Sequence, residues 1–145
     1  MSTLRLQLHY PDLPVPQRVH PKDLGLDLTA MAVESHNARL FFIDTGVSVE
    51  PPAGYYLEVV ARSSLSKTDF ILANSVGIID PDYRGRIRLA LRYLGEGSGV
   101  DAAVELIGCR VAQLILRRRE EATVEVVSEL GATVRGAGGF GSSGS

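Results

Sequence analysis

The sequence predicts an all-β fold of the sandwich, jelly-roll or barrel class. Short stretches in which apolar and polar residues alternate recur along the chain, and clusters of Gly and Pro separate them. No segment has a sustained helical period, and Ser64–Asp69 is expected to form one turn or two of helix. Regular short strands with such punctuation are typical of two-layered or closed β architectures.

The first strand is expected within Leu4–Tyr10, where apolar residues alternate with polar ones until Pro11 ends the pattern. Turns are expected at Pro51–Gly54 and Gly95–Gly99, since Pro and Gly favour turn conformations. The further expected strands are Arg39–Ile43, Tyr55–Val60, Phe70–Ala73, Arg86–Tyr93, Val104–Ile107, Arg110–Leu116 and Thr123–Val127.

Length and composition narrow the class of protein. The 145 residues, 45% of them apolar, predict one domain with its own core. The net charge of −2 argues against a nucleic-acid partner. No apolar run approaches the roughly 18 residues of a membrane span, and no secretory signal is recognisable, so no membrane association is expected. Cys109 is the only cysteine and is expected to be a small buried hydrophobe. Because no intrachain disulfide is possible, a reducing compartment is expected, and with no signal or membrane span recognised a cytoplasmic location is predicted.

The segment Asn74–Gly85 is the richest in functional groups. Asp80 and Pro81 fit the first two positions of a type I turn, and the alternation after it predicts a strand, so a tight β-hairpin is expected. A turn that only connects two strands does not need a carboxylate beside Ile79, an aromatic ring and a guanidinium. This mixture predicts a functional site.

Three other segments admit both a structural and a functional interpretation. Ser63, in Arg62–Lys67, is either the N-cap of a short helix or part of a phosphate site with Arg62. Asp27 is either a turn residue or a ligand. Gln113 lies in an apolar strand and needs a partner if buried, which is either the protein itself or a bound molecule.

The last eleven residues, Arg135–Ser145, cannot form a packed core because five are Gly and three are Ser. The segment is either a frayed tail or a linker-like ending. Arg135 and Phe140 favour more than that, since a Gly-rich strip with one cation and one ring can fold over a phosphorylated ligand.

Five segments, in this order, resemble the five motifs of the trimeric dUTP diphosphatase (dUTPase) family. They are Gly25–Leu28, Arg62–Leu65, Gly77–Gly85, Gly108–Leu114 and Arg135–Gly144. The resemblance implies a jelly-roll-like β fold with one short helix, formed by residues 1–134, and a flexible tail, residues 135–145, that closes over the active site. It implies a homotrimer with shared active sites and Mg²⁺-dependent hydrolysis of dUTP to dUMP and pyrophosphate. That reaction keeps uracil out of DNA and supplies dUMP for dTMP synthesis.

The resemblance also implies a role for individual residues. Asp80 would activate the attacking water, Tyr83 would lie against the deoxyribose, and Asp27 would reach Mg²⁺ through water. Asn74 and the backbone around Gly77 and Ile79 would bind the uracil edge. The phosphates would be held by Arg62, Ser63, Ser64 and Gln113, and the tail would close through Arg135, Phe140, Gly141 and Ser142, with Phe140 stacked on uracil.

Two alternatives remain at this point. A dCTP deaminase of the same superfamily resembles the chain at Arg62–Ser64, but the deaminase uses a Glu on the strand after the hairpin, where this sequence has Ala90. The other alternative is a dUTPase-like fold with a regulatory, protein-binding role.

Overall fold

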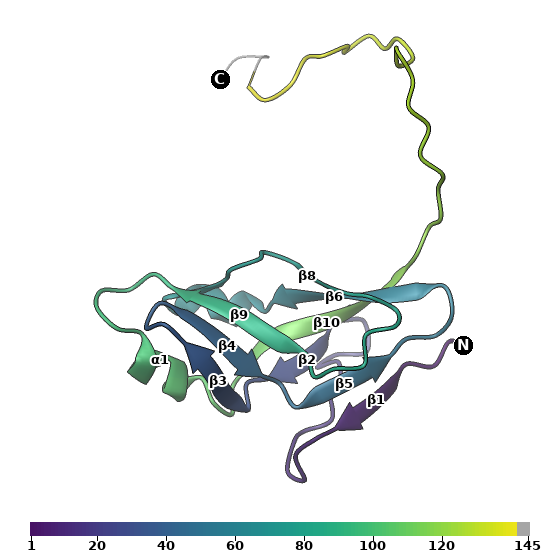
Figure 1. Ribbon diagram of the computed structural model, residues 1–145. Helices are drawn as coiled ribbons and strands as arrows, with labels where there is room; N and C mark the ends of the chain where they lie inside the picture. Colours follow the sequence, from purple (N-terminus) through teal and green to yellow (C-terminus); the bar gives the residue numbers. More distant parts are fainter. Residues whose placement is uncertain (142–145) are drawn as a thin grey trace.

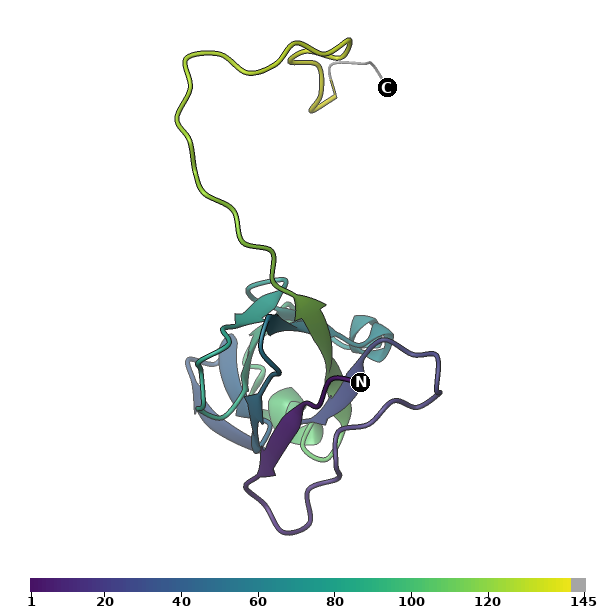
Figure 2. The same ribbon diagram turned by 90° about the vertical axis from the view of Figure 1, so that its right-hand side faces the viewer.

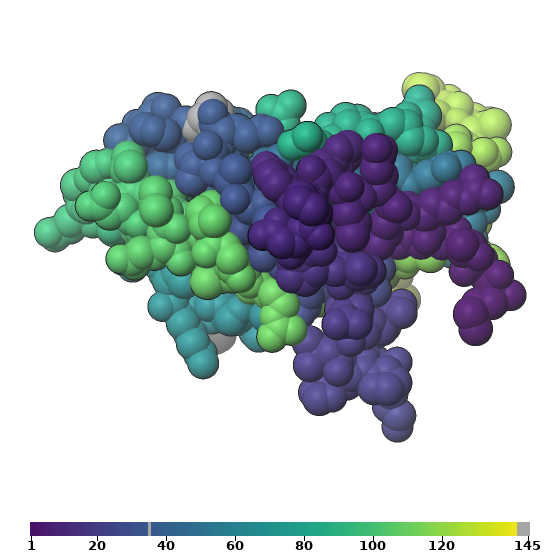
Figure 3. Space-filling view, turned by 90° about the horizontal axis from the view of Figure 1, so that it is seen from below, coloured from purple at the N-terminus to yellow at the C-terminus, as the bar shows by residue number. Residues whose placement is uncertain are grey.

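Two four-stranded antiparallel sheets enclose the core of the protein. The computed structural model describes residues 1–141, apart from the side chain of Ser35. The first sheet has the order β2 (Leu26–Thr29), β10 (Arg110–Arg118), β6 (Tyr55–Ala61) and β8 (Gly77–Ile79), and the second β3 (Ala32–His36), β4 (Leu40–Asp44), β9 (Arg88–Tyr93) and β7 (Phe70–Leu72). A two-stranded sheet of β1 (Arg5–Leu8) and β5 (Val47–Glu50) lies beside them (Figure 1), and the N-terminal segment, purple in Figure 3, lies on the face seen from below.

The core lies between the sheets, and the strands surround it when the molecule is viewed from the side (Figure 2). The alternation of apolar and polar residues along each strand explains this core, because every second side chain points inward. On β9, Leu89 and Leu91 are buried whereas Arg88 and Arg92 are exposed. The all-β class is thus confirmed. The fully buried side chains include Leu28, Phe41, Ile43, Leu57, Ile87, Leu91 and Leu114.

The structure contains two short helical segments. The 3₁₀ helix η1 (Ser63–Lys67) confirms the expected helical turn. The α-helix α1 (Val100–Glu105) overturns the strand expected at Val104–Ile107. Ala103 and Leu106 are buried three residues apart while Val104 is exposed, which is a helical spacing, and alternation over four residues was too short to reveal it. No helix of the described residues is long and apolar enough to cross a membrane.

The expected hairpin around Asp80 is wrong in its strand pairing but right in its turn. The backbone N–H of Tyr83 donates to the Asp80 carbonyl at 3.1 Å, the hydrogen bond of a β-turn over these four residues. However, β8 pairs with β6, whereas β9 pairs with β4 and β7. The loop 80–87 therefore crosses from one sheet to the other. Alternation predicts that a segment is a strand but not which strand it pairs with.

Residues 119–141 extend away from the sheets (Figures 1 and 2). The strand expected at Thr123–Val127 is absent, and Val124 and Val126 are more than 90% exposed. The segment has β-branched residues, but the same chain offers no strand edge beside it. The sheets end at Arg118, so residues 119–134 lie outside the body that they were expected to join.

Candidate functional site

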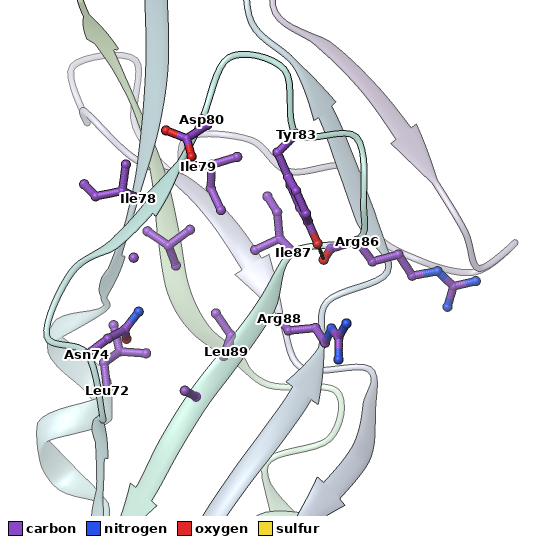
Figure 4. A pocket seen from close by; sticks show the side chains of 13 residues that line it. Leu72, Asn74, Ile78, Ile79, Asp80, Tyr83, Arg86, Ile87, Arg88 and Leu89 are labelled. Atoms are coloured by element: carbon purple, nitrogen blue, oxygen red, sulfur yellow. Dashed lines mark hydrogen bonds between the residues drawn. The ribbon is translucent and has the colours of Figure 1, made fainter.

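A pocket of about 250 Å³ opens between β8, the 80–87 loop and β9 (Figure 4). Apolar side chains of both sheets form its floor, among them Val59, Leu72 and Leu89. Polar groups gather at its rim. The rim and walls include Asn74, Gly77, Ile78, Ile79, Asp80, Tyr83, Arg86, Ile87, Arg88 and Ala90. We refer to this cavity as the β8 pocket. Its apolar floor and few polar groups are typical of a small-molecule site.

The β8 strand can bind a planar polar ligand through its backbone. It is the edge strand of its sheet, and pairs only with β6 among the described residues. The other edge of β8 carries backbone N–H and C=O groups with no strand beside them, which can form directional hydrogen bonds to the edge of a ligand. Asn74 places its amide nearby, because a Cβ added to Gly77 would lie 3.4 Å from the Asn74 Nδ2 atom.

Asp80 stands at the rim of the β8 pocket. Its side chain is exposed, and no cation pairs with it within the part of the chain that the structure describes. It also lines a second, open hollow with Tyr56 and Arg119. An accessible carboxylate without a fixed partner can accept a proton from a water molecule, which is what a general base has to do.

The Tyr83 ring is fixed by two contacts. Its hydroxyl donates to the Arg86 carbonyl at 3.0 Å, the dashed line in Figure 4. A Cβ added to Gly85 would lie 2.3 Å from the Tyr83 hydroxyl, so the ring needs a glycine there. The ring thus forms a wall of the pocket, and a bound ligand would have to fit beside it.

A second pocket contains the charged groups from the first two motifs, and we refer to it as the Asp27 pocket. The Asp27 side chain is only 11% exposed and pairs with two guanidinium groups, Arg62 at 3.0 Å and Arg110 at 3.2 Å. Arg62 in turn donates to the Arg110 carbonyl at 3.3 Å. The pocket is lined by Val19, His20, Asp23, Leu24, Gly25, Asp27, Arg62, Ser63 and Gln113. Two arginines held side by side form a site for anionic oxygens.

Gln113 fits both of its interpretations. Its Nε2 atom donates to the Ala61 carbonyl at 3.2 Å, and the same side chain lines the Asp27 pocket. The approach of Gly25 is close, since a Cβ there would lie 2.1 Å from the Gln113 Oε1 atom. The first motif therefore needs its glycine to leave room for the glutamine of the fourth.

The N-cap interpretation of Ser63 is wrong, as is the expected burial of Cys109. Arg62 is the residue at the N-cap of η1, and no side chain caps the helix, so the Ser63 hydroxyl is available at the pocket wall. Ser64 is exposed on η1. Cys109 is exposed because it follows Gly108, whose φ of +88° belongs to the turn between α1 and β10.

The tail residues lie away from both pockets. Arg135 donates to the Gly138 carbonyl at 2.6 Å, and Phe140 is fully exposed. Gly141 ends the described part of the chain, and Ser142 lies outside the described residues. The sequence had not assigned a site role to His20, Arg86 or Arg110. For Arg110 the missing information was the strand register, which places β2 beside β10.

The family is decided by comparison with known proteins. The family model for dUTPase matches residues 12–144, which is most of the chain. The chain belongs to the dUTPase family. A match of this extent includes the loop 80–87, the Asp27 pocket and most of the tail.

Curated relatives of this family member carry the name deoxyuridine 5'-triphosphate nucleotidohydrolase. The protein of Anaplasma marginale is 40% identical, with 99% of this chain and 97% of the relative covered. That of Escherichia phage T5 is 38% identical, covering 98% and 99%. A mutant of the Staphylococcus bacteriophage 80alpha dUTPase superposes with a TM-score of 0.76 at 24% identity, covering 97% of this chain and 98% of the other. The jelly-roll-like dUTPase fold is therefore confirmed.

The structure brings the predicted residues together in two groups rather than one. Asn74, Gly77, Ile79, Asp80 and Tyr83 meet at the β8 pocket, and Asp27, Arg62, Ser63 and Gln113 meet at the Asp27 pocket. The two linings share no residue. Asp27 and Gln113 alternate with the buried Leu28 and Leu114, so they face outward, whereas the β8 pocket opens between the sheets.

The residues of the Asp27 pocket fit a metal ion held mainly by water and substrate. No group of three metal-binding side chains gathers among residues 1–141. Both Asp27 oxygens already accept from arginines. Mg²⁺ keeps several water ligands and is often bound through one or two carboxylates and the substrate phosphates. A single carboxylate beside an anion site suits that mode of binding.

Proposed function

We propose that this member of the dUTPase family hydrolyses dUTP to dUMP and pyrophosphate, which keeps uracil out of DNA and supplies dUMP for dTMP synthesis. The observation that carries the proposal is the β8 pocket, in which an edge strand, the Tyr83 ring and the Asp80 carboxylate surround one cavity of about 250 Å³. Together with the family membership, this arrangement provides a cavity for a nucleoside and, beside it, a carboxylate that can act as general base.

In this proposal the β8 pocket holds the deoxyuridine. The edge of uracil forms hydrogen bonds with the free backbone groups near Gly77 and Ile79 and with the Asn74 amide. A 5-methyl group would be crowded against that backbone, which disfavours thymine. Tyr83 lies against the sugar, and its fixed ring leaves no room for a ribose 2′-hydroxyl.

Asp80 is the proposed catalytic base. It takes a proton from the water that attacks the triphosphate chain, while positive groups neutralise the charge on the phosphates. Arg62, Ser63, Ser64 and Gln113 are proposed to hold those phosphates. The tail, residues 135–145, closes with Phe140 on the uracil and with Arg135, Gly141 and Ser142 near the phosphates, which excludes bulk water.

A divalent cation is the cofactor of the dUTPase family, and we propose Mg²⁺ for this chain, with Asp27 reaching it through water. When bound, the ion supplies charge neutralisation at the phosphate oxygens. One solved structure of a phage phi11 dUTPase, similar in fold with a TM-score of 0.66, is described as containing a structural Mg(II) ion.

We further propose a homotrimer whose active sites are shared. The β8 and Asp27 pockets open on different faces of one chain, so a nucleotide long enough to need both is served best by pockets of neighbouring copies. The exposed valines of residues 122–127 support assembly too, because a second copy would cover them. We also propose a cytoplasmic location, because the exposed free Cys109 fits a reducing compartment.

Pyrophosphate release compared across dUTP, dCTP, dTTP and UTP tests the function. We expect rapid release from dUTP alone. A deaminase would instead release ammonia from dCTP, and the half-buried Ala90 in the pocket wall offers no carboxylate for that reaction. Pyrophosphate release at equal rates from all four nucleotides would contradict the proposed base and sugar recognition.

A further inference from the structure

A buried carboxylate lies just behind the β8 pocket, outside both lining sets. Asp44 ends β4 and is 1% exposed. Its Oδ1 atom accepts from the Gly46 backbone N–H at 2.8 Å. Its Oδ2 atom accepts from the Tyr10 hydroxyl at 2.9 Å and from the Arg86 guanidinium at 2.8 Å. Burial alone would raise the pKa of Asp44, but these hydrogen bonds outweigh it and lower the pKa below its ordinary value.

The Arg86 side chain is directed toward this carboxylate and not into the β8 pocket. Figure 4 shows it running away from the pocket, with the guanidinium on the far side from Asp80. The guanidinium also lies over the Tyr10 ring, 5.7 Å from the ring centroid, which is within the roughly 6 Å of a cation–π contact. The hydrogen bond to Asp44 raises the pKa of Arg86, so the cation is permanent.

The backbone next to Arg86 is fixed by the residues that follow Asp44. Both the N–H and the hydroxyl of Thr45 donate to the Ile87 carbonyl, at 3.1 and 2.7 Å, and the Ile87 N–H donates to the Val47 carbonyl at 2.8 Å. Thr45 is fully buried. The chain therefore enters β9 with its backbone held by hydrogen bonds at Ile87 and with the side chain of Arg86 held by an ion pair.

We propose that Asp44 and Arg86 are positioning residues for Tyr83. They hold in place the Arg86 carbonyl to which the Tyr83 hydroxyl donates, and so set the distance between the ring and the sugar. The inference rests on the proposed sugar-contacting role of Tyr83. It extends the site to Asp44 and Tyr10, which lie outside the lining of the β8 pocket, and to the Arg86 guanidinium, which is directed away from the pocket. It also links the N-terminal segment to substrate selectivity.

The exposure of the two partners supports a geometric role, because the Asp44 side chain is 1% exposed whereas that of Arg86 is 42% exposed. An ion pair with a partly exposed partner adds little net stability, whereas removing that partner leaves the buried carboxylate without its cation. The ion pair instead fixes the orientation of Arg86, because its guanidinium is bound to a carboxylate that Tyr10 and Gly46 themselves hold in place.

The test compares kcat/KM for dUTP and for UTP in three variants. Arg86→Ala removes the anchor, Arg86→Lys retains a cation that can reach Asp44, and Arg92→Ala is the matched control, an exposed arginine on β9 outside the pocket. We expect the dUTP-to-UTP selectivity to fall about fivefold in Arg86→Ala, to recover mostly in Arg86→Lys and to stay unchanged in Arg92→Ala. Melting temperatures establish that each variant is folded.

A double-mutant cycle shows whether the effect passes through Tyr83. Tyr83→Phe keeps the ring but removes its hydroxyl, so adding Arg86→Ala to it should change the selectivity no further. If Tyr83→Phe and Arg86→Ala lower the selectivity independently, so that their effects multiply in the double variant, the inference is overturned. An Arg86→Ala variant that is destabilised but has unaltered selectivity would overturn it too. Tyr83→Ala separates the two hypotheses. If it leaves selectivity unchanged, the sugar role itself is wrong and the inference falls with it; if it lowers selectivity and Arg86→Ala does not, only the inference fails.

Discussion

At the scale of single residues, Asp80 is the group on which turnover is expected to depend. Asp80→Asn keeps the size and the turn, but an amide cannot take the proton of the attacking water. We therefore expect binding of a non-hydrolysable dUTP analogue to persist, while kcat falls by about 10² to 10⁴. Pyrophosphate release and calorimetric titration measure the two quantities. Asp82→Asn, an exposed carboxylate of the same turn, is the control. Turnover near the wild-type rate in Asp80→Asn would disprove its assignment as the base.

Asp44 is a residue whose charge should be visible in the pH dependence of stability. Its pKa in the folded protein lies below the ordinary 3.8, so its ionised form stabilises the fold at higher pH. That contribution is lost as the pH falls through the folded-state pKa. We expect Asp44→Asn to be less stable than the wild type at neutral pH, with the difference shrinking as the pH falls below 3.8. Urea denaturation at several pH values measures it, and Asp12→Asn, at an exposed position, is the control. A gap that stays constant with pH would show that the charge of Asp44 is not the cause.

At the scale of elements, the sequence predicted strands that extend through a regular alternation and failed where the decisive contact is distant. The ends predicted for β6, β9 and β10 lie within two residues of the ends in the structure, because buried and exposed side chains alternate along these strands. α1 was missed because its apolar residues cover too few turns. The strand at Thr123–Val127 has the right composition, but a strand also needs a neighbour, and its own chain supplies none.

The same limit applies to the candidate site. Short motifs predicted Asp80, Tyr83 and the turn that carries them, since turn chemistry is local. Asp44 and Arg86 lie 42 positions apart, and their contact depends on β4 and β9 being neighbours in the second sheet. No local pattern predicts such a pairing, which is why this ion pair is visible only in three dimensions.

The tail is the element whose removal should separate activity from folding. Residues 135–141 belong to neither pocket lining and extend away from the sheets, so deleting residues 135–145 should change the melting temperature little. If the tail closes over the nucleotide, kcat/KM for dUTP should fall at least about 100-fold, because a closed site excludes water and completes the charge contacts. Phe140→Ala should reproduce a part of this loss. Sedimentation of the truncated protein provides the control, and dissociation into monomers would mean that the tail is needed for assembly instead.

At the scale of the whole molecule, the separation of the two pockets makes a prediction about mixed assemblies. Asp80→Asn impairs the β8 pocket and Arg62→Ala the Asp27 pocket, so each variant alone should be nearly inactive. If one active site takes its two pockets from different copies, mixed trimers contain sites in which both pockets are intact. Random mixing in equal amounts gives each such site a probability of one half for each pocket, and about a quarter of the wild-type activity should return.

The experiment unfolds and refolds the two variants together and assays pyrophosphate release, with each variant refolded alone as the control. Native mass spectrometry of the mixture, with one variant isotopically labelled, establishes that mixed trimers have formed. Mixed trimers without recovered activity would place both pockets of a site in the same chain. In that case the outward-facing Asp27 pocket and the inter-sheet β8 pocket would have to be joined within one copy, which the geometry of the isolated chain disfavours because their linings share no residue.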